Sequence, residues 1–383
     1  NVTTEFGYAD NAPQVPDGYQ WDYLGADALM TQISATKNGF KAKSGAEYKV
    51  LWMDRNMQRV SVPVLRKIAE LAKTGAFIGG LRPGAPASLA DNKAEFEALV
   101  KDIYDSGRAN VVETTNLQTL LDKAGVKQDA AVSSDLRFLH RTFKGIEIYW
   151  INKPARDVKD VTISFRTAGL EPTLWHPETG ATEPVSYKVV GDRTEVSFTM
   201  VPEDAVFVVF AGKGQPSLSI APKQESTMAT IDSPWTVKFQ EKRGAPESAT
   251  FETLKSYTEF SEFGIKYFSG VASYNNTVQV SKVEGQTYID LGEVQHTAEV
   301  WVNGVYCGRA WKQPYRVDIT PAVKEGENQI EVKVANPWIN RLVGDLQPDC
   351  PEKVAYADNR AATETTPLEK SGLIGPVKIV NLK

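Results

Sequence analysis

Seven aromatic and polar side chains near the end of the sequence have the chemistry that sugar binding requires. They are Trp311, Tyr315, Asn336, Trp338, Asn340, Arg341 and Asp345. Indole and phenol rings stack on the C–H faces of a pyranose, while amide, guanidinium and carboxylate groups pair with its hydroxyls. The alternative for the tryptophans is packing in a core or at a domain interface. For the three residues after position 339, the alternative is hydrogen bonding that holds a loop.

No pair of carboxylates has the sequence context of a catalytic dyad. Glu178 lies in a turn rich in Pro, Thr and Gly, and a solvated turn explains it. Asp102 and Asp105 are three apart on a predicted helix, which is typical of a wet face. Glu259 and Glu262 could form a pair at the mouth of a β block, but we favour surface positions for both.

The histidines and cysteines predict neither a zinc site nor a disulfide scaffold. His140, His176 and His296 lie far apart in the sequence and lack closely spaced partners. His140 stands beside Arg141, where we favour a packed polar pair over a ligand contact. Cys307 and Cys350 could form one bridge, but Cys307 lies in a strand-like run, so a buried free thiol is expected there.

Composition places the chain among globular proteins. It has 383 residues, of which 42% are hydrophobic and 24% charged, enough for two to three domains. A net charge of −5 argues against nucleic-acid binding, which needs a basic face. The longest apolar run, near residues 205–211, is too short to span a bilayer. The chain begins with Asn and has no leader pattern, so we expect a processed protein or a piece of a longer one.

Residues 1–134 alternate helix and strand patterns, which predicts an α/β domain with a parallel sheet. A helix is expected over Ala26 to Lys37, ended by Asn38-Gly39. Much later in the chain, Trp301 lies inside a predicted strand and is therefore expected in a core. The other predicted strands of this domain are 48–53, 76–81 and 110–113, and its other helices begin near Ser61, Lys93 and Asn116.

Two all-β regions follow. Residues 135–215 predict a small β-sandwich, 216–230 a Gly/Pro/Ser/Lys-rich linker, and 231–383 a jelly roll. Expected strands of the sandwich are 147–151, 161–165, 184–190, 195–200 and 205–210; those of the jelly roll are 267–274, 276–283, 287–291, 298–302 and 329–334. Asn303-Gly304 is the strongest hairpin pattern in the chain, because both positions accept a positive φ.

A family resemblance emerges from motifs along the whole chain. In order they are Gly18 to Tyr23, Tyr48 to Leu51, Leu139 to Arg141, Ile148 to Asn152, Leu174 to Gly180, Tyr267 to Gly270, Trp301 to Val305, Trp311 to Arg316, Ile319 to Pro321, Val334 to Trp338, Asn340 to Asp345 and Ser371 to Val377. The C-terminal motifs resemble the galactose-binding-like β-sandwich that accompanies many glycoside hydrolases. Together the motifs resemble the C-terminal region of glycoside hydrolase family 106, the α-L-rhamnosidases.

This resemblance implies a multidomain enzyme whose catalytic barrel, with acidic catalytic residues and a calcium ion, precedes these residues. The α/β segment resembles a flavodoxin- or amidotransferase-like domain that lacks its first strand, since Asn1 would fall just past that strand. No Cys precedes position 307 and no nucleophile stands in the Gly79-Gly80 turn, so a scaffold is expected rather than an amidotransferase. The glycines form no phosphate-binding pattern.

The leading hypothesis is therefore a non-catalytic accessory region of an inverting α-L-rhamnosidase, secreted or periplasmic, that acts on rhamnose-containing glycans. Its partners would be a carbohydrate and the N-terminal catalytic barrel, in the same protein or a second fragment, with no nucleic acid and no membrane span. No cofactor is expected in this chain; calcium belongs to the barrel. The alternatives are a stand-alone carbohydrate-binding module and a structural or oligomerisation region.

Overall fold

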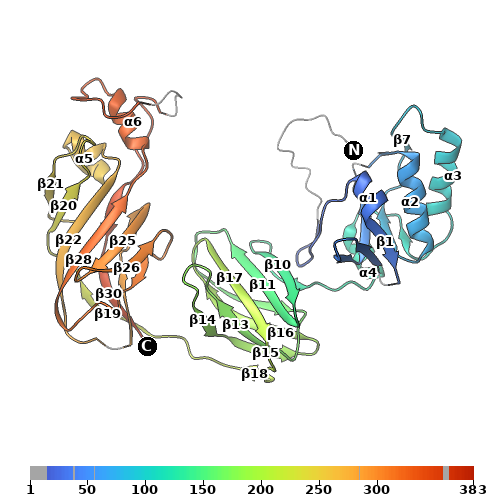
Figure 1. The fold of residues 1–383 in the computed structure, drawn as a ribbon, viewed down its shortest axis with the longest axis horizontal. Coiled ribbons are helices and arrows are strands. Elements are labelled where there is room, and N and C mark those ends of the chain that lie inside the picture. Colours follow the sequence, from blue (N-terminus) through green and yellow to red (C-terminus); the bar gives the residue numbers. More distant parts are fainter. Residues whose placement is uncertain (1–14, 38, 56, 284, 357–361) are drawn as a thin grey trace. The chain divides into compact units, whose positions relative to one another are not determined.

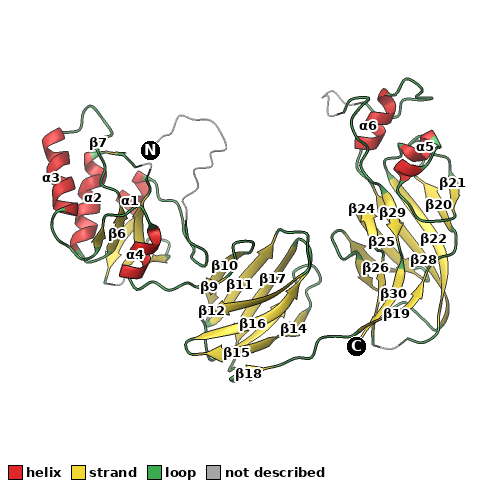
Figure 2. Cartoon of the chain, turned by 180° about the vertical axis from the view of Figure 1, so that it is seen from behind, coloured by secondary structure: helices red, strands yellow, loops and turns green. Residues whose placement is uncertain are grey.

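The computed structural model describes residues 15–37, 39–55, 57–283, 285–356 and 362–383. Strands predominate over helices in these residues (Figures 1 and 2). The chain divides into two compact units, one of Asn1–Ile151, Thr162–Phe198 and Val206–Leu218, the other of Asn152–Val161, Thr199–Ala205 and Ser219–Lys383. The helices of the described residues are too short and too polar to cross a membrane.

The N-terminal part of the described chain contains a parallel sheet with helices, as the alternating pattern of helix and strand predicts. The sheet has the order β4 (Val50–Met53), β6 (Phe77–Gly80), β8 (Val111–Val112), and its helices are α2 (Val62–Lys73), α3 (Lys93–Tyr104) and α4 (Leu117–Lys123). Two short strands that lie between β4 and α3 in the sequence, β5 (Arg59–Val60) and β7 (Ala85–Pro86), form a separate parallel pair. Asn116 caps α4 by accepting a hydrogen bond from the Gln118 N–H at 2.9 Å, as expected. Leu65 and Ile68 of α2 are almost fully buried, so this helix covers the apolar core.

The predicted helix over Ala26 to Lys37 is wrong in its second half. Helix α1 (Ala26–Gln32) ends early, and β1 (Ile33–Thr36), β2 (Gly39–Ala42) and β3 (Glu47–Tyr48) form an antiparallel sheet. β-branched residues such as Ile33 prefer extended backbone. Gly39 has φ +134°, and a Cβ there would lie 2.1 Å from the Tyr48 carbonyl oxygen, so glycine is required by the sheet and not by a helix end. Asn38 lies outside the described residues, and so do residues 1–14, which were expected to begin just past the missing first strand.

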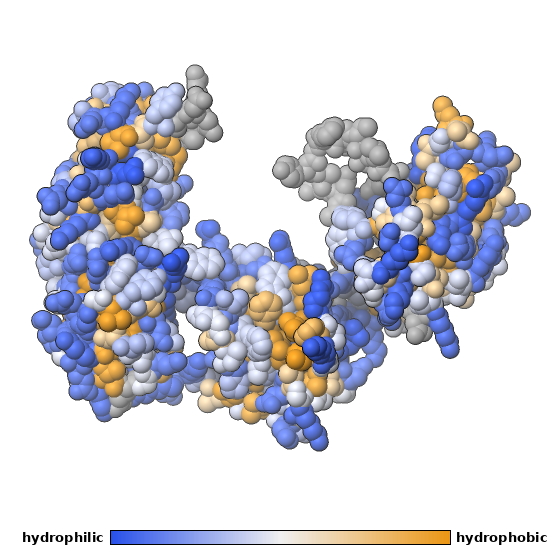
Figure 3. Space-filling model, viewed as in Figure 1, coloured by the Kyte–Doolittle hydropathy of each residue, from blue (hydrophilic) through white to orange (hydrophobic). Residues whose placement is uncertain are grey.

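The predicted β-sandwich consists of two five-stranded sheets. One has the order β10 (Arg137–Phe143), β11 (Ile146–Lys153), β17 (Asp204–Ala211), β13 (Glu171–Trp175), β14 (Thr182–Pro184); the other has the order β18 (Ser217–Leu218), β15 (Ser186–Val190), β16 (Arg193–Met200), β12 (Lys159–Phe165), β9 (Ala130–Ala131). Tyr149, Phe165 and Phe210 form its aromatic core, with ring centroids 4.6 Å apart for the first two. Large apolar side chains also reach its surface, including Leu139 and Trp175, and apolar residues gather on the visible face of this part of the chain (Figure 3).

Two strands lie in the segment 216–230 that composition predicts as a linker. Strand β18 extends a sheet of the sandwich beside β15. Strand β19 (Glu225–Thr230) pairs with the last strand of the chain, β30 (Lys378–Leu382). The low apolar content of segment 216–230 is therefore that of two edge strands, because an edge strand has fewer apolar neighbours to contact.

The C-terminal region has a six-stranded and a four-stranded sheet. The first has the order β21 (Ser248–Phe251), β20 (Trp235–Phe239), β22 (Val271–Val280), β28 (Gly326–Ala335), β25 (Thr297–Val302), β26 (Val305–Ala310); the second has the order β19, β30, β23 (Gln286–Asp290), β27 (Arg316–Asp318). A short pair, β24 (Glu293–Gln295) and β29 (Gly372–Gly375), and the helices η1 (Tyr257–Glu259), α5 (Phe263–Lys266) and α6 (Ile339–Leu346) complete it. Trp235, Phe268 and Tyr274 are buried in its core.

Two details of this region test the strand predictions. The hairpin at Asn303-Gly304 is confirmed, with φ of 52° and 80° at the two positions, between β25 and β26. The prediction of separate strands 267–274 and 276–283 is wrong, because β22 runs unbroken past Asn275 and pairs with β28 over its whole length. The polar Asn275-Asn276 pair is no turn: Asn275 faces the outer surface, and the Asn276 amide pins a neighbouring loop.

Candidate functional site

The predicted sugar-binding residues fall into two groups in the C-terminal region. Asn336 follows β28, Trp338 caps α6, and Asn340, Arg341 and Asp345 lie on α6. Trp311 and Tyr315 lie between β26 and β27. Among the residues that the structure describes, no hydrogen bond, ion pair or ring contact joins the second group to the first.

The three charged or amide residues of α6 are buried. Arg341 is 1% exposed and Asp345 4% exposed, and the Arg341 Nη2 lies 2.6 Å from the Asp345 Oδ1. Asp345 also accepts hydrogen bonds from the backbone N–H groups of Val354 and Ala355, at 3.1 and 2.6 Å. The carboxylate therefore ties the helix to the loop that follows it, which is the loop-stabilising alternative.

Asn340 makes a second tie to the same loop. Its Nδ2 donates to the Glu369 carbonyl oxygen at 2.7 Å, and its Oδ1 accepts from the Glu369 N–H at 2.9 Å. Asn336 accepts a hydrogen bond from the Gly372 N–H at 2.8 Å. The Asn340 amide is therefore bonded within the chain through both its donor and its acceptor, and the Asn336 Nδ2 is buried, so little of either side chain is available to a ligand.

An open pocket beside these ties carries the aromatic surface that stacking needs. Its volume is about 440 Å³, and it is lined by Trp338, Leu342, Val354, Ala355 and Tyr356. Trp338 is 43% exposed, and the Arg243 guanidinium carbon lies 4.4 Å from its ring centroid. One indole face therefore has a cation–π partner inside the chain. Trp311 is exposed, whereas Tyr315 is half-buried and packs against the hydrophobic core of the C-terminal region.

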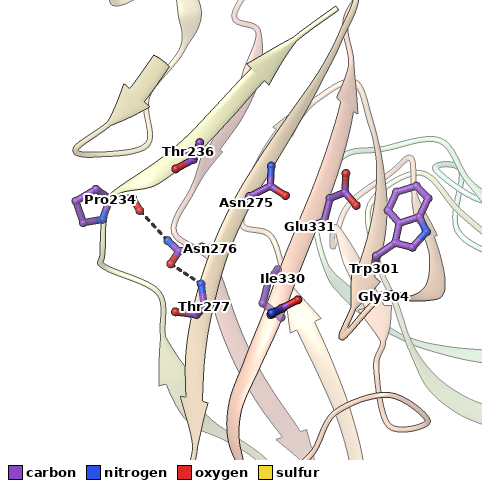
Figure 4. Close-up of a pocket in the computed structure, with 10 residues that line it drawn as sticks. Pro234, Thr236, Asn275, Asn276, Thr277, Trp301, Gly304, Ile330 and Glu331 are labelled. Carbon is purple, nitrogen blue, oxygen red and sulfur yellow. Dashed lines mark hydrogen bonds between the residues drawn. The ribbon is translucent and has the colours of Figure 1, made fainter. Parts of the chain in front are cut away.

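Trp301 is not in the core, contrary to expectation. It lies on β25, where Ala298, Val300 and Val302 are fully buried and the alternate residues, including Trp301, face outward. Figure 4 shows its indole at one end of a shallow groove across the six-stranded sheet. The period-two alternation of this strand was the available signal, because it places Trp301 opposite to the apolar residues on either side of it.

His140, on β10, bridges the carboxylate of Glu147 on β11 and that of Asp129, which comes just before β9. Its Nδ1 lies 2.6 Å from the Asp129 Oδ2 and its Nε2 2.7 Å from the Glu147 Oε2. Its ring stacks on Tyr149 with centroids 3.9 Å apart. Burial lowers the pKa of His140, but the hydrogen bonds and charges of Asp129 and Glu147 outweigh it, so the pKa is raised overall. The imidazole of His140 thus belongs to a buried ionic cluster with acidic partners, while the Arg141 Nη1 donates to the His140 carbonyl oxygen at 2.8 Å.

The His140 cluster predicts a stability that depends on pH. A raised folded-state pKa means that the protonated imidazole stabilises the fold fully below its unfolded pKa of about 6.5, and that this contribution is lost as pH rises through the folded value. We expect His140→Gln to lower the free energy of unfolding by about 1–3 kcal/mol near pH 6 and by progressively less at higher pH. Urea unfolding of both proteins at several pH values measures this difference.

The control is His176→Gln, whose ion pair with Glu183 is more exposed and whose substitution should cost less. A difference between wild type and His140→Gln that stays constant or grows with pH would contradict the proton-bridged arrangement.

Three of the carboxylates considered for catalysis, Asp102, Asp105 and Glu259, have structural partners. Asp102 contacts Arg108 and Lys73, and Asp105 contacts Arg82. Glu259 accepts a hydrogen bond from the Ser256 N–H in a capping box. Across the described ranges, no three His, Cys, Asp or Glu side chains are grouped to hold a metal ion. Cys307 and Cys350 are free thiols and both are half-buried.

Comparison with known proteins relates both halves of the chain to glycoside hydrolases. Residues 1–189 match the family model of the alpha-L-rhamnosidases, glycoside hydrolase family 106, and residues 256–362 match the galactose-binding domain-like model of glycosyl hydrolases 2. A rhamnosidase from Novosphingobium sp. PP1Y is similar in structure over 96% of this chain, with a TM-score of 0.85 and 33% sequence identity. A Formosa agariphila protein that carries a β-glucuronidase name is 33% identical over 261 residues, 59% of this chain.

The chain is much shorter than these relatives. It spans 36% of the rhamnosidase and 22% of the Formosa agariphila protein. A β-glucuronidase from an uncultured Clostridium sp. aligns over 43% of this chain and 30% of the length of the β-glucuronidase. The TM-score is 0.30 and the sequence identity 20%, so this alignment supports no statement about the fold.

Proposed function

We propose, from the match of residues 1–189 to the alpha-L-rhamnosidase family model, that this chain is the accessory, non-catalytic region of an inverting α-L-rhamnosidase that acts on rhamnose-containing glycans. The observation that carries the proposal is the similarity to the Novosphingobium rhamnosidase over almost the entire chain, at 33% identity. Since the chain corresponds to 36% of that enzyme, the remaining length has ample room for a catalytic barrel of about 250 residues.

The chemistry of the described residues supports an accessory role. Inverting hydrolysis needs a carboxylic acid and a carboxylate about 6.5–9.5 Å apart around the sugar. Asp102, Asp105 and Glu259 are instead committed to arginine, lysine or backbone partners. In this proposal the catalytic acids and the calcium ion belong to the barrel, and no step is assigned to a metal in this chain.

Further parts of the proposal concern the setting of the enzyme. The parallel sheet β4-β6-β8 with its helices serves as an amidotransferase-like scaffold without that activity, because no cysteine precedes position 307. The pocket at Trp338 is the part of the predicted sugar-binding segment that we assign to glycan contact, since its aromatic surface is exposed. The enzyme acts outside the cytoplasm, where glycans that carry rhamnose are met.

The test of this proposal is an activity assay of the 383-residue chain. We expect no turnover of an aryl α-L-rhamnoside above the uncatalysed rate, with or without calcium, because the catalytic carboxylates are placed in the barrel. Release of the chromophore measures turnover, a full-length α-L-rhamnosidase serves as positive control, and circular dichroism establishes that the chain is folded. Clear turnover by the folded chain would show that it contains the catalytic machinery.

A further inference from the structure

The groove lies across four neighbouring strands of the six-stranded sheet, β20, β22, β28 and β25, and a row of side chains along it continues to Tyr306 on β26. Strand register places Thr236 beside Asn275, Asn275 beside Glu331, Glu331 beside Trp301, and Trp301 beside Tyr306. At about 4.8 Å between strands, this row of side chains is roughly 19 Å long. The groove beside it has a volume of about 490 Å³, and polar side chains contribute most of its lining (Figure 4).

Aromatic side chains form one end of the groove. The ring centroids of Trp301 and Tyr306 lie 5.1 Å apart with the planes inclined at 56°, and Tyr306 is 48% exposed. The Lys333 Nζ lies 4.2 Å from the Trp301 ring centroid and 3.5 Å from the Glu331 Oε1. Lys333 thus fixes the indole and also neutralises Glu331, the one acidic residue among the described residues that line the groove.

Unused hydrogen-bonding groups line the rest of the groove. The side chains of Thr236, Thr277 and Gln329 make no hydrogen bond within the described part of the chain, and neither does the Trp301 Nε1. Asn275 donates through Nδ2 to the Ser273 carbonyl oxygen at 3.3 Å, which leaves its Oδ1 as an acceptor. The Glu331 Oε1 accepts from the Ser273 Oγ at 2.6 Å, which leaves its Oε2.

Two fully bonded amides hold the ends of the groove in place. Asn276 donates to the Ser233 and Pro234 carbonyl oxygens at 3.0 and 3.3 Å, and its Oδ1 accepts from the Ser233 Oγ and the Thr277 N–H. At the other end, Asn303 donates to the Ala322 carbonyl oxygen and accepts from the Gln329 N–H. Walls fixed in this way reduce the ordering cost of binding.

We infer that this groove binds a neutral oligosaccharide, with Trp301 and Tyr306 against the C–H face of one sugar unit. Free hydroxyl, amide and carboxylate groups on one side of an aromatic surface match the alternating apolar faces and hydroxyls of a sugar. The pairing of Glu331 with Lys333 leaves the groove without net charge, which favours a neutral ligand over a polyanion. The mainly polar lining also differs from the apolar patch that an obligate protein interface would need. This binding does not depend on the proposed rhamnosidase role.

Calorimetric titration of the 383-residue chain with two probes tests the inference. The probes are a rhamnose-containing tetrasaccharide and cellotetraose, each at millimolar concentration. Binding of the first probe alone assigns a rhamnose-bearing ligand, and binding of both assigns a broader class of neutral glycan. We expect Trp301→Ala to weaken binding by about tenfold or more and Gln329→Ala by about three- to tenfold.

The matched control is Trp175→Ala, an exposed tryptophan of the β-sandwich, which should leave binding unchanged. Gln329→Ala removes no described hydrogen bond of the fold, so it decides the outcome if Trp301→Ala fails to fold. The inference is overturned if neither probe binds, or if folded Trp301→Ala or folded Gln329→Ala binds the probe as tightly as the wild type. It is likewise overturned if binding is lost in Trp338→Ala and retained in Trp301→Ala, which would place it at α6.

Discussion

Replacing Asp345 by alanine is expected to destabilise α6 and its following loop by about 3–5 kcal/mol, because Arg341 would remain as a buried and uncompensated charge. Arg341 is 1% exposed and its Nη2 lies 2.6 Å from the Asp345 Oδ1. The same substitution removes the acceptor of the Val354 and Ala355 N–H groups. Amide hydrogen exchange over residues 339–355 reports the free energy of this local opening.

Two further variants separate charge burial from loss of the side chain. Asp349→Ala, an exposed aspartate in the same segment, should change the opening free energy by no more than about 0.5 kcal/mol. The double variant Arg341→Met/Asp345→Leu should cost less than Asp345→Ala, because it leaves no unpaired charge. If Asp345→Ala matched Asp349→Ala, the ion pair would not be what holds this segment together.

Replacing Gly80 by alanine should destabilise the parallel sheet by about 2–6 kcal/mol, the combined cost of a positive φ and a steric clash. Gly80 has φ +129°, and a Cβ would lie 2.2 Å from the Met53 carbonyl oxygen, on the neighbouring strand β4. The Met53 carbonyl is part of the backbone, so it cannot move away from an added Cβ as the end of a flexible side chain could. Urea unfolding, followed by the far-ultraviolet circular dichroism of the helices that pack on this sheet, measures the loss.

Gly84→Ala is the matched control in the loop that follows. A Cβ at Gly84 would find its nearest neighbour at 4.0 Å, so the change should be neutral or stabilise by up to about 1 kcal/mol. Equal effects at the two glycines would argue that Gly80 is not required by the approach of β4. The expected difference also explains the Gly79-Gly80 pair without a nucleophile or a phosphate, because close packing alone demands glycine there.

The sequence predicted elements best where a local rule determines them. The helices that became α2, α3 and α4 have a cap or a stop and an apolar stripe, and the Asn303-Gly304 hairpin needs only two residues that accept positive φ. The prediction of a helix over the second half of Ala26–Lys37 failed because antiparallel pairing with the next few residues, Gly39–Ala42, outweighed helix propensity. The unbroken strand β22 was missed because polar residues that face outward resemble a turn in sequence.

The candidate site was harder to predict because residue type does not fix exposure. Arg341 and Asp345 have side chains that suit sugar hydroxyls, yet α6 turns both inward, where they pair with each other. Trp301 has the composition of a core residue, yet strand alternation turns it outward. In both cases the exposure of a side chain depends on which face of its helix or strand packs against the rest of the protein. Contacts between residues distant in sequence determine that face.

The pairing of β19 with β30 brings the two ends of residues 224–383 together. The Gln224 N–H donates to the Lys383 carbonyl oxygen at 2.8 Å, and the Lys383 N–H donates back to Gln224 at 2.9 Å. A domain whose two chain ends adjoin can be inserted into a surface turn of another protein with little strain. It can also be circularly permuted, by joining its ends through a short linker and opening the chain at another loop. The pairing of β19 with β30 therefore gives the C-terminal region adjacent points of entry and exit, the geometry that such an insertion needs.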